Sequence, residues 1–341
     1  MNPGFVLVTG AGGFVGRQLC PQLVRAGWRV RATWVHAQPP TAMVGENIEW
    51  HRISALGPST DWAPVLADGI TAVVHLAALA HRVGPREQVP DSAYDIANHL
   101  GTARLIEQVS KVPSVRRLVF VSSIGAVTSL AEEQLDENSA CRPDTAYGRS
   151  KLAAEHAVQH GLAGSKVEWC ILRPPLLYGP GNPGNMARLL RLLKLRLPLP
   201  FASIHNRRSF LYVGNFVNAL VTSLTHPMAA NRVFCVSDDA DLSTPELMLR
   251  LSHLSGRPAR LWPFPVAGLR LLGILGDILA RATGRPLAFD SGTINKFCGS
   301  LSVNGDIFRS ACDWRPPFSV DEGLRATVAL PDASARRMLS S

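Results

Sequence analysis

Two residues in the first half of the chain carry side chains that together could move a proton. Tyr147 and Lys151 lie four residues apart in DTAYGRSKLAAE, residues 144–155, which has a helical pattern. This spacing places both side chains on one helix face, one turn apart. A phenol, with an ordinary pKa of about 10, is a poor acid-base catalyst at neutral pH unless a cation stabilises the phenolate. Lys151 can supply that cation.

A third residue, Ser123, ends the apolar run RLVFVSS, residues 117–123. The carboxyl ends of parallel strands face the ligand crevice, so a hydroxyl there could orient a carbonyl or alcohol oxygen. Tyr147 would then pass a proton while a nicotinamide passes a hydride. Ser122 is the adjacent alternative. A strand-end serine or a Tyr-x-x-x-Lys spacing alone is usually structural, so the prediction depends on a dinucleotide site elsewhere in the chain.

The stretch VLVTGAGGFVGRQL, residues 6–19, predicts such a site. Gly10, Gly13 and Gly16 follow an apolar strand and open a helix. The first glycine would turn the chain, the second would let the backbone approach a pyrophosphate, and the third would let the helix pack on the strand. The helix N-terminus would then face the phosphate charge. A tight turn without a ligand is the structural alternative.

The next strand should indicate which dinucleotide is bound. An acidic residue at its end would bind the ribose hydroxyls of NAD, whereas a nearby arginine would accommodate the phosphate of NADP. No carboxylate is present from Thr33 to His36. Arg31 or His36 could meet a phosphate, although Arg31 could equally point to solvent. We therefore expect NADP(H) to be favoured over NAD(H).

Apolar runs alternate with helical patterns along the first half of the chain. Strands of this kind predict an α/β fold with a doubly wound parallel sheet covered on both faces. We expect a dinucleotide-binding domain over residues 1–175, with a returning segment near 210–240, and a smaller α/β substrate domain over 176–335. The runs are FVLVTG (5–10), WRVRATW (28–34), IEWHRI (48–53), AVVHLAA (72–78), RLVFVSS (117–123) and VEWCILRP (167–174).

Composition excludes several classes of protein. The 341 residues include six scattered cysteines without metal-ligand spacing, so we expect neither a metal site nor a disulfide framework. The net charge of +9 favours acidic partners, but no nucleic-acid-binding module accompanies it. We find neither a signal peptide nor an apolar run of membrane-spanning length, and we expect a cytoplasmic protein.

Two apolar stretches could contact a membrane. The first is the basic run MARLLRLLKLRLPLP (186–200), and the second is FPVAGLRLLGILGDILA (264–280), which Arg270 and Asp277 interrupt. We expect both to pack in the core or at a subunit contact, since each has a plausible inward face. Peripheral membrane contact is therefore not expected.

An ordered series of motifs resembles the extended short-chain dehydrogenase/reductase family, in its branch acting on nucleotide sugars. The motifs are TGAGGFVG, HLAA, NHLGT, VSSIGAV, YGRSK and RPPLLYGPG, and the resemblance spans nearly the whole chain. It implies a Rossmann domain, a smaller C-terminal substrate domain and a possible homodimer. It also implies catalytic roles for Ser123, Tyr147 and Lys151, and a supporting role for Asn98. The remaining cofactor-binding positions that it implies are Phe14, Val15, Ala77, Ala78 and Pro174.

The same resemblance suggests where a UDP-linked sugar would bind. Asn185 precedes a helix where relatives hold UDP, although a helix cap is the alternative. Arg208 resembles a diphosphate-binding arginine, with Arg207 as its rival. Lys296 is a weaker candidate for the diphosphate. His81 could touch the sugar, or it could be a solvated loop residue.

The resemblance leaves three reactions open at C4 of the sugar. Dehydratases commonly carry an acidic pair beside the catalytic serine, where this chain has Ile124 and Gly125. The closest resemblance is to reductases that convert a UDP-2-acetamido-2,6-dideoxy-4-ketohexose to UDP-N-acetylquinovosamine or its C4 epimer, for O-antigen and other lipopolysaccharide sugars. A UDP-glucose or UDP-N-acetylglucosamine 4-epimerase is the alternative. A non-catalytic dinucleotide-binding scaffold is a weaker one, because it would not need Tyr147 and Lys151 together.

Overall fold

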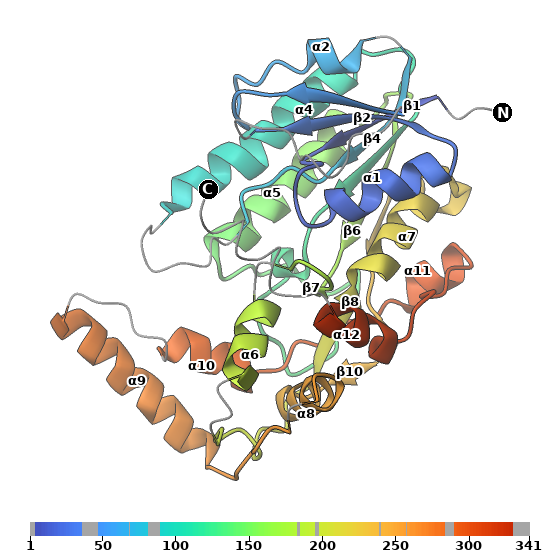
Figure 1. Cartoon of the computed structure of the whole chain (residues 1–341). Coiled ribbons are helices and arrows are strands. Elements are labelled where there is room, and N and C mark those ends of the chain that lie inside the picture. The colour runs from blue at the N-terminus through green and yellow to red at the C-terminus, as the bar shows by residue number, and fades with distance from the viewer. Residues whose placement is uncertain are drawn as a thin grey trace.

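The structure is a computed structural model, and Figure 1 shows the whole chain. The residues that it describes are 4–35, 47–67, 69–80, 89–182, 185–194, 198–238, 240–256, 258–283 and 290–329.

A seven-stranded sheet forms the centre of the larger layered unit. Its strand order is β3-β2-β1-β4-β5-β6-β9, and every neighbouring pair is parallel. The chain runs outward from β1 in one direction and then returns to β4, so the order reverses between β1 and β4. This confirms the predicted doubly wound parallel sheet. The strands are β1 (Phe5–Thr9), β2 (Arg29–Trp34), β3 (Ile48–Arg52), β4 (Ile70–His75), β5 (Arg117–Val121), β6 (Glu168–Arg173) and β9 (Arg232–Cys235).

Helices cover both faces of this sheet, as Figure 1 shows. One apolar core contains side chains of α1 (Gly16–Arg25), α7 (Val213–Thr225) and α11 (Asp306–Ala311). The core on the other face contains side chains of α2 (Ala63–Leu66), α4 (Gly101–Val109) and α5 (Ala146–Gly161). Because both faces are buried, the central strands are continuous apolar runs instead of alternating ones.

A smaller unit with its own core lies beside the carboxyl edge of the large sheet. In its three-stranded sheet, β8 runs parallel to β7 and antiparallel to β10. Its elements are β7 (Leu176–Tyr178), α6 (Asn185–Lys194), β8 (Arg208–Tyr212), β10 (Asp241–Leu242), α8 (Thr244–Leu254), α9 (Val266–Thr283), α10 (Ser291–Cys298) and α12 (Val320–Ala329). The chain crosses between the units more than once, because β9 returns to the large sheet. The domain limits 1–175 and 176–335 stay a prediction.

The two apolar stretches that we expected to be packed have different environments. On α6, Met186, Leu189 and Leu193 are buried in the core of the smaller unit. The helix α9 is not packed in the core, because it projects from the body next to α10 (Figure 1), and packing at a subunit contact stays a prediction. Of the residues of α9, only Leu269 and Gly273 are buried. Among the described residues, every helix is too short or too polar to cross a bilayer.

Candidate active site

The glycine loop crosses the carboxyl end of β1 against the end of β4. Gly10 has a φ of +68°, which L side chains rarely adopt, and a Cβ there would lie 2.8 Å from the backbone of Ala77. Gly16 begins α1 in equally close contact, because a Cβ on it would lie 2.4 Å from the Ala11 carbonyl oxygen. Two of the three glycines therefore have the turning and packing roles that the spacing predicts.

The middle of the loop lies at the N-terminus of α1. Gly13 is exposed and donates its N–H to the Gly10 carbonyl, and Phe14 and Val15 are half-buried. The Ala11 N–H donates to the Thr33 carbonyl, which ties the loop to β2. A helix N-terminus with an exposed glycine before it can hold a phosphate through backbone N–H groups and the helix dipole.

A buried histidine fixes the chain after β4. One ring nitrogen of His75 lies 2.6 Å from the Thr9 hydroxyl, and the other lies 3.0 Å from the Thr102 hydroxyl. Thr9 in turn accepts the Ala77 N–H at 3.2 Å. Burial, together with the nearby charge of Lys151, lowers the pKa of His75 to about 3. The neutral imidazole therefore holds Ala77 beside Gly10, and Ala78, half-buried, follows.

The end of β2 corrects one cofactor prediction. Arg31 is buried and points to the amino end of the sheet, where it pairs with Glu49 at 3.0 Å and donates to the carbonyl oxygens of Val65 and Ala67. It is therefore not placed to meet a cofactor phosphate at the carboxyl edge. These partners lie 18 to 36 residues away and could not be predicted from a local pattern. His36, the other predicted residue, lies outside the described residues.

Two other groups at the end of β2 fit a polar ligand. The Thr33 hydroxyl and the Trp34 indole N–H are buried and have no hydrogen-bond partner among the described residues. Buried polar groups are normally hydrogen-bonded, so each unpaired one needs an explanation. Thr33 also borders the glycine loop through its carbonyl. The ribose of a dinucleotide would supply partners here, and the residues present fit such a group.

The two adjacent serines after β5 have separate roles. Ser122 is buried and donates its hydroxyl to Glu155. Ser123 accepts the Gly125 N–H at 3.0 Å and shares a hydrogen bond with the Tyr147 side chain. The structure therefore brings Ser123, the residue that family spacing favours, to Tyr147.

A close contact between glycines sets the position of Tyr147. The side chain of Thr145 caps α5 by accepting the Gly148 N–H at 3.0 Å. A Cβ on Gly148 would lie 2.2 Å from the Gly125 carbonyl oxygen, so the helix can approach this turn only with glycine there. The ring of Tyr94 lies edge-on to that of Tyr147, with centroids 6.3 Å apart. Neither Tyr94 nor Gly148 was predicted from the sequence to be part of the site.

Burial shifts both candidate catalytic groups toward their neutral forms. Burial raises the pKa of Tyr147 to about 12, although the Ser123 hydrogen bond opposes this shift. Burial lowers the pKa of Lys151 to about 7, and the charge of Glu155 opposes it. Lys151 donates to the Val121 carbonyl at 2.6 Å and lies 4.3 Å above the Phe120 ring. A neutral phenol is the proton-donating form, and the adjacent amine can become the cation that a phenolate needs.

Asn98 connects three parts of the site. It lies in a π-helix, Asp95–Leu100, a geometry that is rare and frequent at functional sites. Its side chain accepts the Leu79 N–H at 2.6 Å and donates to the Leu79 carbonyl and the Ser150 hydroxyl, both at 3.0 Å. Asn98 thus links the chain after β4 to α5, one residue before Lys151.

A buried ion pair, which was not predicted from the sequence, holds α5 against β6. Arg173 of β6 forms a two-nitrogen contact with Glu155, at 3.0 Å from Nε and 2.6 Å from Nη2. Both side chains are almost fully buried. Glu155 lies four residues after Lys151, and this spacing could have indicated that both side chains lie on the same face of the helix. The next residue, Pro174, is buried, and its carbonyl accepts the Ile124 N–H at 2.9 Å.

The candidate substrate residues are brought together only in part. Arg208 donates to the carbonyl oxygens of Lys296 and Gly299, at 2.8 and 3.0 Å, and it has no ion-pair partner among the described residues. Burial lowers its pKa. Lys296 itself is exposed. Asn185 begins α6, but its side chain is outside the described set, as is His81.

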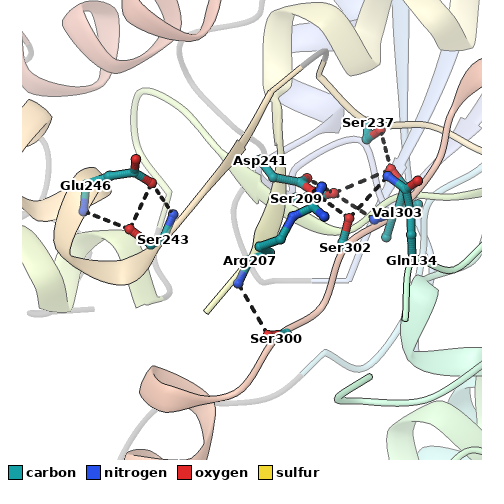
Figure 2. A network of polar contacts seen from close by, with 10 residues as sticks. All are labelled: Gln134, Arg207, Ser209, Ser237, Asp241, Ser243, Glu246, Ser300, Ser302 and Val303. Carbon is teal, nitrogen blue, oxygen red and sulfur yellow. Dashed lines mark hydrogen bonds and ion pairs between the residues drawn. The ribbon is translucent and has the colours of Figure 1, made fainter. Parts of the chain in front are cut away.

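Arg207, the rival of Arg208, belongs to a different network, shown in Figure 2. It is exposed and pairs with Asp241 at 3.3 Å. Asp241 also accepts the hydroxyls of Ser209 and Ser302, which tie β8 and β10 to the segment before α11. Arg207 is thus engaged with a carboxylate, whereas Arg208 remains the better candidate for a diphosphate.

Comparisons with known proteins agree on a family. The model of the NAD dependent epimerase/dehydratase family matches residues 6–236. The chain is 32% identical over 336 residues to a UDP-glucose 4-epimerase of Vibrio cholerae, with 96% of the chain and 95% of the relative covered. It is 27% identical over 343 residues to an N-acetyl-alpha-D-glucosaminyl-diphospho-ditrans,octacis-undecaprenol 4-epimerase of Escherichia coli O157:H7, with coverage of 97% and 96%. The structure of MoeE5 in complex with UDP-glucuronic acid and NAD superposes with a TM-score of 0.73 at 25% identity and covers 98% of this chain and 100% of that one.

Proposed function

The chain belongs to the NAD dependent epimerase/dehydratase family, in its nucleotide-sugar branch, and from this premise we propose that it transfers a hydride at C4 of a UDP-linked hexose. The observation that carries the proposal is the placement of Ser123, Tyr147 and Lys151 at the carboxyl edge of the sheet. That edge also holds the glycine loop, two strands away. A bound nicotinamide would supply or accept the hydride.

The chain's own residues would move the proton. Ser123 would donate a hydrogen bond to the oxygen on C4 and orient it. Tyr147 would give its phenolic proton to that oxygen as the hydride arrives at carbon. The resulting phenolate would raise the pKa of Lys151 from its value of about 7, because an opposite charge nearby favours the ammonium form. In the reverse direction the phenolate would take the proton back.

The first candidate reaction is reduction of the C4 ketone of a UDP-2-acetamido-2,6-dideoxy-4-ketohexose to UDP-N-acetylquinovosamine or its C4 epimer. It is supported by the resemblance of the motifs to such reductases and by the lack of a carboxylate at Thr33, Trp34 and Val35. A ribose-binding carboxylate suits an enzyme that retains NAD through its cycle. With Arg31 engaged by Glu49, the preference for NADP(H) rests on this missing carboxylate alone.

The second candidate is 4-epimerisation of a UDP-sugar. It is supported by the Vibrio cholerae and Escherichia coli relatives described above. Both are named as 4-epimerases, and the chain matches each over nearly its whole length. The same three residues would act twice, first removing and then returning the proton. Dehydratases of the extended short-chain dehydrogenase/reductase family commonly carry an acidic pair where this chain has Ile124 and Gly125. This difference disfavours dehydration as the reaction.

One experiment separates these candidates. The protein is mixed with a UDP-4-keto-6-deoxy-N-acetylhexosamine and either NADPH or NADH, and both cofactor absorbance and product NMR are followed. Stoichiometric oxidation of the cofactor supports reduction. A parallel incubation contains UDP-glucose or UDP-N-acetylglucosamine and no added reductant. Formation of the corresponding C4 epimer in it supports epimerisation. Tyr147→Phe should abolish either activity while cofactor binding persists; unchanged turnover would overturn the catalytic assignment.

A further inference from the structure

The helix α9 presents a wide apolar face that nothing in the described chain covers. Six of its leucine and isoleucine side chains keep about half of their surface exposed. At 100° per residue they occupy a continuous arc of about 160° around the helix, with no charged residue inside it. Contiguous apolar patches on soluble proteins are usually interaction sites. The six residues, here called the α9 face, are Leu271, Leu272, Ile274, Leu275, Ile278 and Leu279.

Basic residues predominate around the α9 face. Arg270 and Arg281 border the arc on the helix itself and are exposed. Lys296 on the adjoining α10 is exposed as well. The carboxylate of α9, Asp277, accepts the Ser291 N–H at 3.2 Å, and Asp290 caps α10, so both are engaged within the hairpin. The surface is therefore apolar at its centre, and two arginines lie along one edge of it, on the same side as Asp277.

An aromatic pair stands where the chain enters α9. Trp262 is 43% exposed, and its ring lies edge-on to Phe264 with centroids 5.3 Å apart. Tryptophan is enriched at the boundary between lipid and water, where its apolar ring and polar N–H are both satisfied. An apolar helix face with arginines along its edge and a tryptophan near its end is typical of helices that lie in the plane of a membrane surface.

We propose that the α9 face docks on an anionic phospholipid bilayer, with the helix lying parallel to the surface and Trp262 at the interface. The leucines and isoleucines would enter the acyl boundary, and Arg270 and Arg281 would meet the lipid phosphates. A second copy of the chain is the weaker occupant, because the described residues of α9 and α10 with the α10 N-cap carry more basic side chains (Arg270, Arg281 and Lys296) than carboxylates (Asp277 and Asp290). The net charge of +9 acts in the same direction as the local charges.

Docking would also bring Arg208, the candidate diphosphate-binding residue, within one helix of the docked face. The hairpin continues into α10, and the carbonyl oxygens of Lys296 and Gly299 at its end accept from Arg208. Arg208 is therefore joined by two hydrogen bonds to the end of α10, and α10 contacts the docked helix α9. This proposal does not depend on which C4 reaction is correct, because vesicle binding is measured without a sugar or cofactor.

Cosedimentation of the full chain with vesicles tests the proposal. Vesicles of phosphatidylglycerol and phosphatidylethanolamine should bind the protein at least tenfold more strongly than phosphatidylcholine vesicles, and 0.5 M salt should weaken that binding. Leu271→Gln/Ile278→Gln should reduce the partition coefficient at least tenfold. The matched control is Met228→Gln/Leu249→Gln, at side chains of similar exposure on other elements, which should change it less than twofold.

Two further measurements decide between occupants. Arg270→Gln/Arg281→Gln should weaken binding to anionic vesicles by about fivefold per arginine, and Arg25→Gln/Arg116→Gln should have a smaller effect. Fluorescence quenching by brominated lipid should largely disappear in Trp262→Phe. The proposal is overturned if the protein binds neither vesicle, or if light scattering finds a dimer in solution that Leu271→Gln/Ile278→Gln dissociates.

Discussion

The two serines at the end of β5 differ in partner although they are adjacent in sequence. Successive side chains of an extended segment point in opposite directions, so one serine meets the buried Glu155 and the other meets Tyr147. The motif VSSIGAV predicts that one of the two is functional. It does not say which one, because that depends on where α5 packs.

This difference yields a paired prediction. Ser123→Ala should lower kcat by about 10²-fold with little change in stability, because the hydroxyl orients the reacting oxygen. Ser122→Ala should leave kcat within a few-fold but cost about 1 kcal/mol of unfolding free energy, since Glu155 loses a buried donor. Steady-state kinetics and urea unfolding of both variants measure the contrast. The reverse pattern would assign the catalytic hydroxyl to Ser122.

At the scale of elements, the buried pair of Glu155 and Arg173 fixes α5 against β6 behind Lys151. Glu155→Gln leaves the arginine charge buried and unpaired, so we expect it to lower the unfolding free energy by about 3 kcal/mol. It also removes a charge that raises the Lys151 pKa, so that pKa should fall further below about 7. The limb of the pH–rate profile that depends on protonated Lys151 should then move to lower pH.

A double variant controls for this interpretation. Arg173→Met/Glu155→Gln removes both charges, and it should be more stable than Glu155→Gln alone because no isolated charge stays buried. Recovery of stability without recovery of the pH profile would separate the packing role of the pair from its effect on Lys151. If Glu155→Gln changed neither quantity, the pair would have no part in positioning the site.

The contact between α5 and the turn after β5 makes a second prediction at this scale. Gly148→Ala puts a Cβ 2.2 Å from the Gly125 carbonyl oxygen, so α5 must shift outward and carry Tyr147 with it. We expect a loss of about 1–3 kcal/mol in stability and at least a tenfold loss in kcat, both measurable on the purified variant. Gly292→Ala in α10 is the control, because its nearest atom is a flexible carboxylate oxygen at 3.3 Å. Equal behaviour of the two variants would contradict the proposed role of the contact.

For the molecule as a whole, the sequence was informative where a pattern is local and repeated. Each of the six apolar runs overlaps one of the strands β1 to β6, and the central strands β1, β4 and β5 are almost wholly apolar because both of their faces are buried. The glycine spacing likewise predicted the loop at β1. Partners distant in sequence were not predictable, and Arg31 with Glu49 is the clearest case. The exposed α9 was missed for another reason, since an apolar helix that packs inside and one that faces a partner have the same composition.

The decrease of the unfolding free energy at low pH should depend on His75, the last residue of the central strand β4. Its pKa is about 3 in the folded chain and about 6.5 when unfolded, so the unfolded state binds the proton first as the pH falls. The stabilisation by the neutral imidazole is complete above pH 6.5 and is lost progressively toward pH 3. Between pH 7.5 and 5 the wild type should lose about 2 kcal/mol through this residue, measured by urea unfolding, and His75→Gln should lack that part of the loss. The exposed His253→Gln should keep the wild-type slope; the same slope in all three proteins would mean that another group governs the acid response.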